Sequence, residues 1–354
     1  MTRIVAVTGV VPPHGYRQQQ VTDALATLRR SDGDGRALLD RVHRSAGVTT
    51  RHLALPLPDY AGLTGFGQAN DAFIAAALTL GEQAVGEALA ESGMTPGEID
   101  LVVATSVTGI AVPSIEARLV ERLGLRPDIA RLPIFGLGCA AGVAGTARLH
   151  DFLLGRPAGA ALLLSTELCS LTLQRGDASP ANLVASALFG DGAGALLAVG
   201  AEHPAHRTGR GPTVVASRSR LYPGTERLLG WDIGDSGFRI VLGAELPELV
   251  RLHVGAEVET FLAEHDLKPG DLAAWICHPG GPKVLDAIAD RLGLPDAALE
   301  LSRRSLAAVG NLSSASVLHI LRDTLAPPPP PPGSHGLMLA LGPGFCSELT
   351  LLRW

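Results

Sequence analysis

The 354-residue sequence is 46% hydrophobic and 18% charged, and its formal net charge is −6 at pH 7. These values exclude an intrinsically disordered chain and a small disulfide-stapled module, because a chain this long and apolar can bury a large core as one large or two medium domains. The negative charge argues against a nucleic-acid partner, which usually requires a basic face.

The N-terminal segment and the cysteines indicate the cellular compartment. The opening MTRIVAVTGVVPPHGY breaks its apolar run with Gly and Pro, so no secretory signal is expected, and no run reaches the ~18 apolar residues of a membrane span. The four cysteines, Cys139, Cys169, Cys277 and Cys346, are too widely spaced for a metal-binding pattern or a dense disulfide framework. We therefore expect a cytoplasmic protein with free thiols, no membrane span and no metal.

Strand-like apolar runs alternate with helical periods along the chain. In the first half the expected buried strands are 99–106, 159–167 and 192–200, and the expected helices are 70–92 and 140–154. In the second half the expected strands are 271–279, 336–344 and 347–354, and the expected helices are 246–265, 281–292 and 313–325. This alternation predicts an α/β protein whose sheet is covered on both faces.

The two halves of the chain resemble each other. The segments MTPGEIDLVVATS (94–106) and LKPGDLAAWICHP (267–279) share a Pro-Gly-acid opening ahead of an apolar strand. Similar segments separated by about half of the chain indicate a duplicated domain. We predict an N-terminal half over 1–205 and a C-terminal half over 206–354, joined within the Pro-, Gly- and Arg-rich stretch 203–213.

One cysteine has the surroundings of a nucleophile. Within PIFGLGCAAGVAG (133–145), Cys139 lies between small residues directly ahead of a predicted helix. Unpaired N–H groups and the positive end of the helix dipole favour thiolate over thiol at such a position. The small neighbours leave room for a carbonyl carbon to reach the sulfur. By itself this pattern leaves open a buried structural cysteine.

Two further stretches add the partners that a nucleophile needs. His278, in CHPGGPKVLDAI (277–288), stands at a strand end before glycines, and Asn311, in VGNLSSA (309–315), stands at a helix start. A cysteine, a histidine and an asparagine at element ends supply a nucleophile, a base or hydrogen-bond donor, and an amide donor.

Five motifs carry a family resemblance: GCAAG, ALFGDGAGALL, HPGGPKVLD, GNLSSASVLHIL and LGPGFCSELTLLRW. In order, spacing and flanking residues they resemble the type III polyketide synthases, the chalcone synthase-like enzymes, from about residue 37 to the C-terminus. The resemblance implies a thiolase-like α/β/α/β/α fold of two pseudo-duplicated halves, and a homodimer with one Cys-His-Asn site in each subunit. By motif, the catalytic residues are Cys139, His278 and Asn311.

The resemblance also implies a reaction. Cys139 takes an acyl group from an acyl-CoA starter, and malonyl-CoA extends it by decarboxylative condensation, with no cofactor besides the coenzyme A thioesters themselves. Three alternatives remain: a degradative thiolase, a ketosynthase III of fatty-acid synthesis, and an inactive scaffold homologue. The thiolase fits poorly, because its second reactive cysteine precedes the C-terminal glycines, whereas Cys346 follows Gly342 and Gly344.

The resemblance assigns residues to the substrate cavity. Phe189 matches the phenylalanine that separates the CoA tunnel from the cavity, whereas Ile240 replaces a second gatekeeping phenylalanine and Trp231 stands where plant members have glycine. The other cavity positions fall on Val107, Cys169, Thr172 and Ser313, with Val112 where one subunit touches the other's cavity.

The product is less determined than the reaction. Because bacterial relatives with a cysteine in place of the plant threonine, as at Cys169, open a tunnel for long acyl chains, an aliphatic starter and an alkylpyrone or alkylresorcinol product are favoured. The alternative is a malonyl-primed synthase of the tetrahydroxynaphthalene or dihydroxyphenylacetyl-CoA type. Arg41 matches a basic residue at the CoA tunnel mouth, and Arg44, Arg51 and Lys283 are further candidates for CoA binding.

Overall fold

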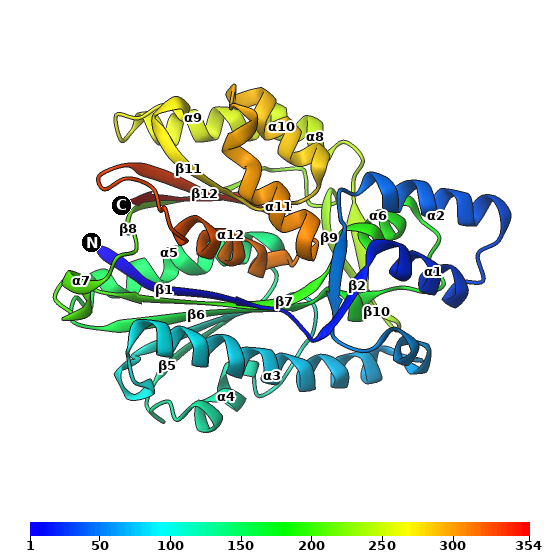
Figure 1. The fold of residues 1–354 in the computed structure, drawn as a ribbon, viewed down its shortest axis with the longest axis horizontal. Helices are drawn as coiled ribbons and strands as arrows, with labels where there is room; N and C mark the ends of the chain where they lie inside the picture. The colour runs from blue at the N-terminus through cyan, green and yellow to red at the C-terminus, as the bar shows by residue number, and fades with distance from the viewer.

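A mixed sheet of nine strands runs through residues 1–354, all of which are described by the computed structural model (Figure 1). Its strand order is β11-β12-β13-β8-β1-β7-β6-β4-β5. The bounds of these strands are β1 Thr2–Val10, β4 Leu101–Thr105, β5 Ala130–Ile134, β6 Ala160–Leu168, β7 Asp191–Val199, β8 Thr213–Leu221, β11 Leu272–Cys277, β12 His335–Gly342 and β13 Cys346–Arg353. Two small sheets stand apart and pair β2 (His14–Arg17) with β3 (Thr50–Leu53) and β9 (Leu229–Gly234) with β10 (Gly237–Leu242).

Helices connect the strands. Their bounds are α1 Gln18–Leu28, α2 Gly33–Ser45, α3 Phe66–Ser92, α4 Ile115–Leu123, α5 Ala141–Leu154, α6 Pro180–Leu188, α7 Ala205–Thr208, α8 Leu246–Leu249, α9 Gly255–Ala263, α10 Pro282–Leu292, α11 Glu300–Val309 and α12 Ser316–Leu325. Short 3-10 helices that bear on the site are η3 (Gly138–Ala140), η4 (Cys169–Thr172) and η8 (Ser313–Ala315).

The strand order repeats on the two sides of the β1–β8 pair. On one side β1 is antiparallel to β7, β7 is antiparallel to β6, and β6 is parallel to β4. On the other side β8, β13, β12 and β11 follow with the same alternation of directions. The structure therefore contains the duplication that the sequence predicts, and the division at residues 205 and 206 stays a prediction.

The helices form three layers around the two halves of the sheet. In the middle, α5 packs against β6 and β13, and α12 packs against β1 and β11, so that each touches both halves. On the outside, α3 and α4 cover one half, and α9 and α10 cover the other (Figure 1). This α/β/α/β/α layering confirms the expected fold.

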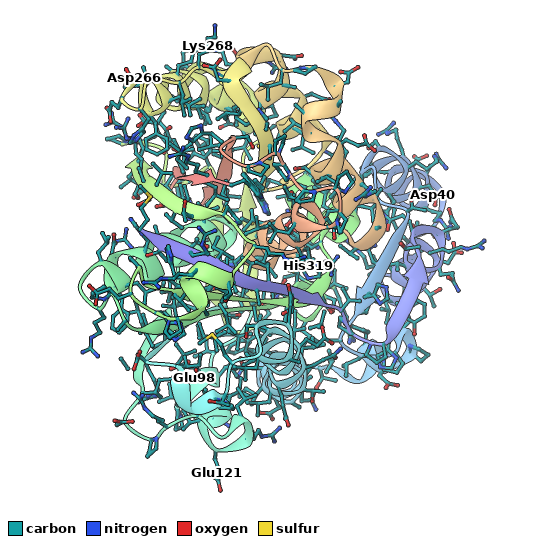
Figure 2. All side chains as sticks on the ribbon, turned by 60° about the vertical axis from the view of Figure 1, so that its left-hand side comes forward. Asp40, Glu98, Glu121, Asp266, Lys268 and His319 are labelled. Carbon is teal, nitrogen blue, oxygen red and sulfur yellow. The ribbon has the colours of Figure 1, made fainter.

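The outer surface and the central layer of the fold carry different side chains. The labelled Glu121 and Lys268 project from the outside of the molecule (Figure 2), and Glu98 is also exposed. His319, on the central helix α12, is buried, and its Nε2 lies 2.9 Å from the carbonyl oxygen of Ala193 on β7. The central layer is thus built from buried side chains of both halves.

Helix α3 is the one helix that is apolar enough, by length and composition, to cross a membrane. Its mean hydropathy is 1.2 over its best window. It packs against β1, β6 and β7 and buries Phe73, Ala77 and Val85 there. In this fold α3 is a core helix.

The predicted elements agree with most of the structure. The strand expected at 99–106 contains β4, and those expected at 159–167 and 192–200 overlap β6 and β7 and differ from them by one residue at each end. The single helix expected over 246–265 is three pieces, α8, a π-helical turn over Val250–Val254, and α9. Strand β8 escapes prediction because its second half is exposed and polar, which breaks the apolar run.

A close approach at Gly142 joins the central helices. A Cβ atom on Gly142 would lie 2.3 Å from the carbonyl oxygen of Ser314 and 2.6 Å from a methyl carbon of Val317. Only a glycine in α5 therefore lets the start of α5 sit on η8 and α12. This contact brings Cys139, just before α5, to the loop that carries Asn311.

The substitution Gly142→Ala should lower the free energy of unfolding by about 1–3 kcal/mol, because the added carbon overlaps a backbone oxygen that cannot turn away. Gly86→Ala is the matched control. Gly86 is also helical, but no atom lies within 4 Å of its Cβ position, so this change should stabilise the protein by about 0.5–1 kcal/mol. Urea unfolding curves measure both changes. Equal stabilisation by the two substitutions would contradict the close approach.

Candidate active site

Cys139 lies in η3, immediately before α5. The preceding residue, Gly138, has φ +49°, and a Cβ atom there would lie 2.7 Å from the ring of Pro343. The cysteine is partly exposed, and its Sγ lies 3.6 Å from the Oγ of Ser313. The nucleophile position predicted at a helix start is therefore present, and it faces a residue of the C-terminal half.

Asn311 lies in the loop between α11 and η8. Its backbone N–H donates to the carbonyl of Leu188 at 2.8 Å, and its carbonyl accepts from Gly190 N–H at 3.0 Å. Its side-chain Oδ1 accepts from the backbone N–H of Ser313 at 2.8 Å, which fixes the orientation of the amide. Because Ser313 also contacts Cys139, the structure brings Cys139, Ser313 and Asn311 into one chain of contacts.

His278 follows β11, and its backbone N–H donates to Leu339 on β12 at 2.8 Å. The side chain is buried, yet neither ring nitrogen has a hydrogen-bond partner in the protein. Burial lowers the pKa of His278 to about 3, so the imidazole is neutral at pH 7. A buried imidazole with both nitrogens free is rare and is available to a ligand.

The thiol of Cys139 is also neutral in the free protein. Burial raises its pKa to about 12, and the hydrogen bond with Ser313 opposes that rise. The helix dipole alone led us to expect a lowered pKa, and burial outweighs it. Both groups are thus uncharged in the free protein, and burial opposes the ionisation of each.

A buried carboxyl group, that of Glu167, is hydrogen-bonded to Ser314, the neighbour of Ser313. Glu167, at the end of β6, accepts from the backbone N–H of Val107 at 3.1 Å, the hydroxyl of Thr108 at 2.9 Å and the hydroxyl of Ser314 at 2.5 Å. Burial raises the pKa of Glu167. Sequence reasoning missed this residue, although a charged residue ending an otherwise apolar strand is the signal that could have found it.

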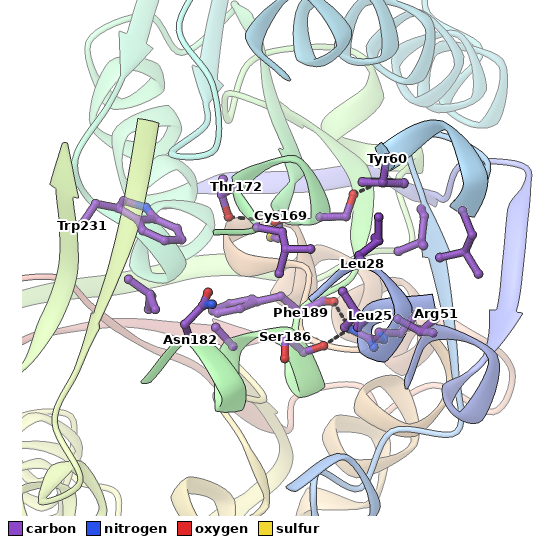
Figure 3. Close-up of a pocket in the computed structure, with 17 residues that line it drawn as sticks. Leu25, Leu28, Arg51, Tyr60, Cys169, Thr172, Asn182, Ser186, Phe189 and Trp231 are labelled. Carbon is purple, nitrogen blue, oxygen red and sulfur yellow. Dashed lines mark hydrogen bonds between the residues drawn. The ribbon is translucent and has the colours of Figure 1, made fainter. Parts of the chain in front are cut away.

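A pocket of about 50 Å³ lies beyond Phe189 (Figure 3). Five of the predicted cavity residues line it, namely Cys169, Thr172, Phe189, Trp231 and Ile240. Cys139, His278 and Asn311 do not line it. The pocket and the loop that carries Asn311 meet at Phe189, whose backbone forms a bridge with Asn311.

The other three predicted cavity residues lie elsewhere. Ser313 contacts Cys139, and Val107 is buried and donates its N–H to Glu167. Val112 is 88% exposed, and it is not among the residues that line the pocket beyond Phe189.

The hairpin β9–β10 closes one side of the pocket. Trp231 on β9 pairs in register with Ile240 on β10. Phe238, which sequence reasoning missed, packs its ring 6.0 Å from that of Trp231 and 5.5 Å from that of Phe66. These aromatic contacts hold the hairpin against the rest of the molecule.

The basic residues predicted to bind CoA separate into two groups. Arg41 and Arg44 on α2 and Lys283 on α10 are exposed, and Gly47, two residues after α2, approaches Pro282 at the start of α10. Arg51 is only 3% exposed and donates to the carbonyls of Ser186 and Phe189. It therefore does not lie at a surface opening, contrary to expectation.

Comparison with known proteins gives matches over the whole chain. Residues 1–203 match the family described as chalcone and stilbene synthases, N-terminal domain, and residues 213–354 match the corresponding C-terminal domain. A 1,3,6,8-tetrahydroxynaphthalene synthase of Streptomyces peucetius subsp. caesius is 57% identical over 354 residues, covering 100% of this chain and 93% of the relative. A putative chalcone synthase of Bacillus subtilis is 33% identical, covering 100% and 99%.

A solved structure agrees with these matches. The crystal structure of 1,3,6,8-tetrahydroxynaphthalene synthase from Streptomyces coelicolor A3(2), described as a bacterial type III polyketide synthase, superposes with a TM-score of 0.93. It is 30% identical and covers 99% of each chain.

Alkylation of Cys139 by iodoacetamide tests the electrostatics of the site. If His278 accepts the thiol proton, His278→Ala should slow alkylation near pH 7.5 by about tenfold or more, which corresponds to one pKa unit. Ser313→Ala should slow it less, since its hydrogen bond lowers the pKa of the thiol and its loss raises that pKa. Intact-mass measurement across pH follows the reaction, with Cys139→Ala as the blank. Superimposable profiles for the wild type and His278→Ala would remove His278 from this role.

Proposed function

The chain belongs to the chalcone and stilbene synthase family of type III polyketide synthases, and from this premise we propose that it makes a tetrahydroxynaphthalene-type product from malonyl-CoA alone. The observation that carries the proposal is the 57% identity with a 1,3,6,8-tetrahydroxynaphthalene synthase over the full chain. This relative favours the malonyl-primed alternative over the alkylpyrone or alkylresorcinol product that the sequence alone favoured.

The size of the pocket supports a short starter. A water needs about 10–15 Å³ of space measured in this way, so about 50 Å³ holds only a few water-sized groups. A long alkyl starter would place many more atoms in this space than a malonyl starter does, and protein interiors resist the displacement of packed side chains. Cys169 lines the pocket as expected, but the space beside it is small.

In the proposed loading step, Cys139 is the nucleophile and His278 the base. As the sulfur attacks the thioester carbonyl of malonyl-CoA, its proton passes to the imidazole, and the departing CoA sulfur then takes that proton. Burial disfavours each charge alone, but the thiolate and imidazolium form together and stabilise each other. A site that is neutral at rest thus becomes charged only during the reaction.

In the proposed extension step, His278 and Asn311 are hydrogen-bond donors. The extender malonyl-CoA loses CO₂, and the resulting enolate places negative charge on its thioester oxygen. Neutral imidazole and amide N–H groups stabilise that charge where it develops. The enolate carbon then attacks the acyl carbonyl on Cys139, the Cys139 thiolate leaves, and the chain lengthened by two carbons is held by CoA.

Two surface features fit the proposed partners. Arg41, Arg44 and Lys283 are exposed cations suited to the phosphates of CoA. Strand β5 is the last strand of the sheet, and exposed Leu132 and Phe135 lie on or next to it. An exposed apolar edge strand is typically covered, so we propose that a second copy of the chain pairs there, placing Val112 against its partner.

Incubation with malonyl-CoA alone tests the proposal. The wild type should form the naphthalene product, identified by mass spectrometry, and should show no preference for acyl-CoA starters of six to twelve carbons. Cys139→Ala should form none, and Cys346→Ser should retain the activity, because Cys346 is a buried residue outside the catalytic loop. Product only in the presence of a long acyl-CoA would instead establish the alkylpyrone interpretation.

The two proposed donors are separable by experiment. His278→Ala should lose acyl loading and malonyl decarboxylation together, whereas Asn311→Ala should load Cys139 normally and lose decarboxylation by about 100-fold, since an amide donates a hydrogen bond but accepts no proton. Loading is measured by intact mass and decarboxylation by release of labelled CO₂. Equal loss of loading in both variants would contradict this division of roles.

A further inference from the structure

The inner end of the pocket carries an arginine that the reaction described above does not use. Arg51, on β3, lines the pocket together with apolar side chains of α1 such as Leu25 and Leu28 (Figure 3). Its Nη1 donates to the carbonyls of Ser186 at 2.6 Å and Phe189 at 2.9 Å. Its Nε and Nη2 are buried, and no protein acceptor lies within hydrogen-bonding distance of either.

No carboxylate pairs directly with this guanidinium. Asp191 is the carboxyl group whose charge most favours the protonated form of Arg51. Its oxygens accept from the N–H of Ala54 at 2.6 Å, from the N–H of Ser170 at 2.8 Å and from the Ser170 hydroxyl. Burial lowers the pKa of Arg51 only to about 10, so the group keeps its charge at neutral pH. The pocket therefore holds a buried cation with an unused pair of donors.

The unused pair has a definite shape. Nε–H and the adjacent Nη2–H point the same way along one edge of the guanidinium plane, and this edge binds two oxygens side by side. A carboxylate has that spacing, and so has an enolised 1,3-diketone. An alkyl group in the same place would leave both donors unsatisfied, at a cost in binding.

We propose that Arg51 binds the oxygenated far end of the growing poly-β-keto chain, through a carboxylate or a 1,3-diketone enolate. The proposal rests on the proposed function, because only a chain primed by malonyl-CoA or another short oxygenated unit presents such oxygens at its far end. Arg51 is then a specificity-determining residue that favours oxygenated ends over alkyl ends.

Phe189 connects the residues around Asn311 with the pocket that holds Arg51. Each extension adds two carbons at the thioester end, which moves the far end away from Cys139. Phe189 stands between, since its backbone bridges Asn311, its carbonyl accepts from Arg51 and its side chain lines the pocket. In this proposal a chain that passes Phe189 reaches Arg51. Its far end therefore contacts Arg51 only after the chain has reached a certain length.

Arg51 also has a structural task, because Nη1 ties the end of α6 to β3. The test must separate this task from ligand binding. Acetoacetyl-CoA and butyryl-CoA are matched starters of four carbons that differ only in the 3-keto oxygen, so their ratio of kcat/KM, with malonyl-CoA as extender, isolates recognition of that oxygen. Damage to the fold lowers both values and leaves the ratio unchanged.

The experiment compares the wild type with Arg51→Met and Arg51→Lys. Arg51→Met should lower the acetoacetyl to butyryl ratio about tenfold or more, equivalent to 1.4 kcal/mol. Arg51→Lys keeps the charge but loses the two-donor edge, so it should lower the ratio by less. Arg29→Met is the control, since Arg29 is a partly buried arginine that donates to the carbonyl of Asp177 and does not line the pocket.

Each outcome decides one question. An unchanged ratio in Arg51→Met, whether total activity falls or not, overturns the proposal for Arg51. A wild type that makes no product from malonyl-CoA alone overturns the proposed function, and the ratio still reports on Arg51. A lowered ratio in Arg29→Met as well as in Arg51→Met would show a general effect of removing cations and would also overturn the proposal.

Discussion

The packing of α5 on η8 and α12 is the constraint on which the site depends. Cys139 comes from the N-terminal half of the chain, and Asn311 and Ser313 come from the C-terminal half. They meet because Gly142 lets two central helices approach until backbone almost touches backbone. Neither half contains the site by itself. The side chains of the site therefore come together only when the central helices pack against each other.

Burial at this junction sets the electrostatics. The thiol of Cys139 and the imidazole of His278 are both held in their uncharged forms by the surrounding protein. The buried carboxyl group of Glu167 is surrounded by donors from Val107, Thr108 and Ser314, and Ser314 lies next to Ser313, which contacts Cys139. Uncharged groups at rest suit the proposed reaction, which creates and removes charge at the sulfur.

The sequence predicts those features that are local in the chain. Cys139, His278 and Asn311 stand at element ends close to glycines in the sequence, which is a local signal. Arg51 and Glu167 are different, because their partners lie far away in the sequence: 135 residues separate Arg51 from Ser186, and 60 and 147 residues separate Glu167 from Val107 and Ser314. An arginine is rarely buried, so expecting Arg51 at a surface opening was reasonable and wrong.

The hairpin β9–β10 has a consequence for how new products could arise in evolution. It belongs to a separate two-stranded sheet, yet it supplies Trp231 and Ile240 to the pocket. Phe189, by contrast, shares a backbone bridge with Asn311, so a change in its path would also move Asn311. Mutations in the hairpin β9–β10 therefore change the shape of the pocket without moving Asn311. We expect changes of substrate in evolution to arise mainly through this hairpin.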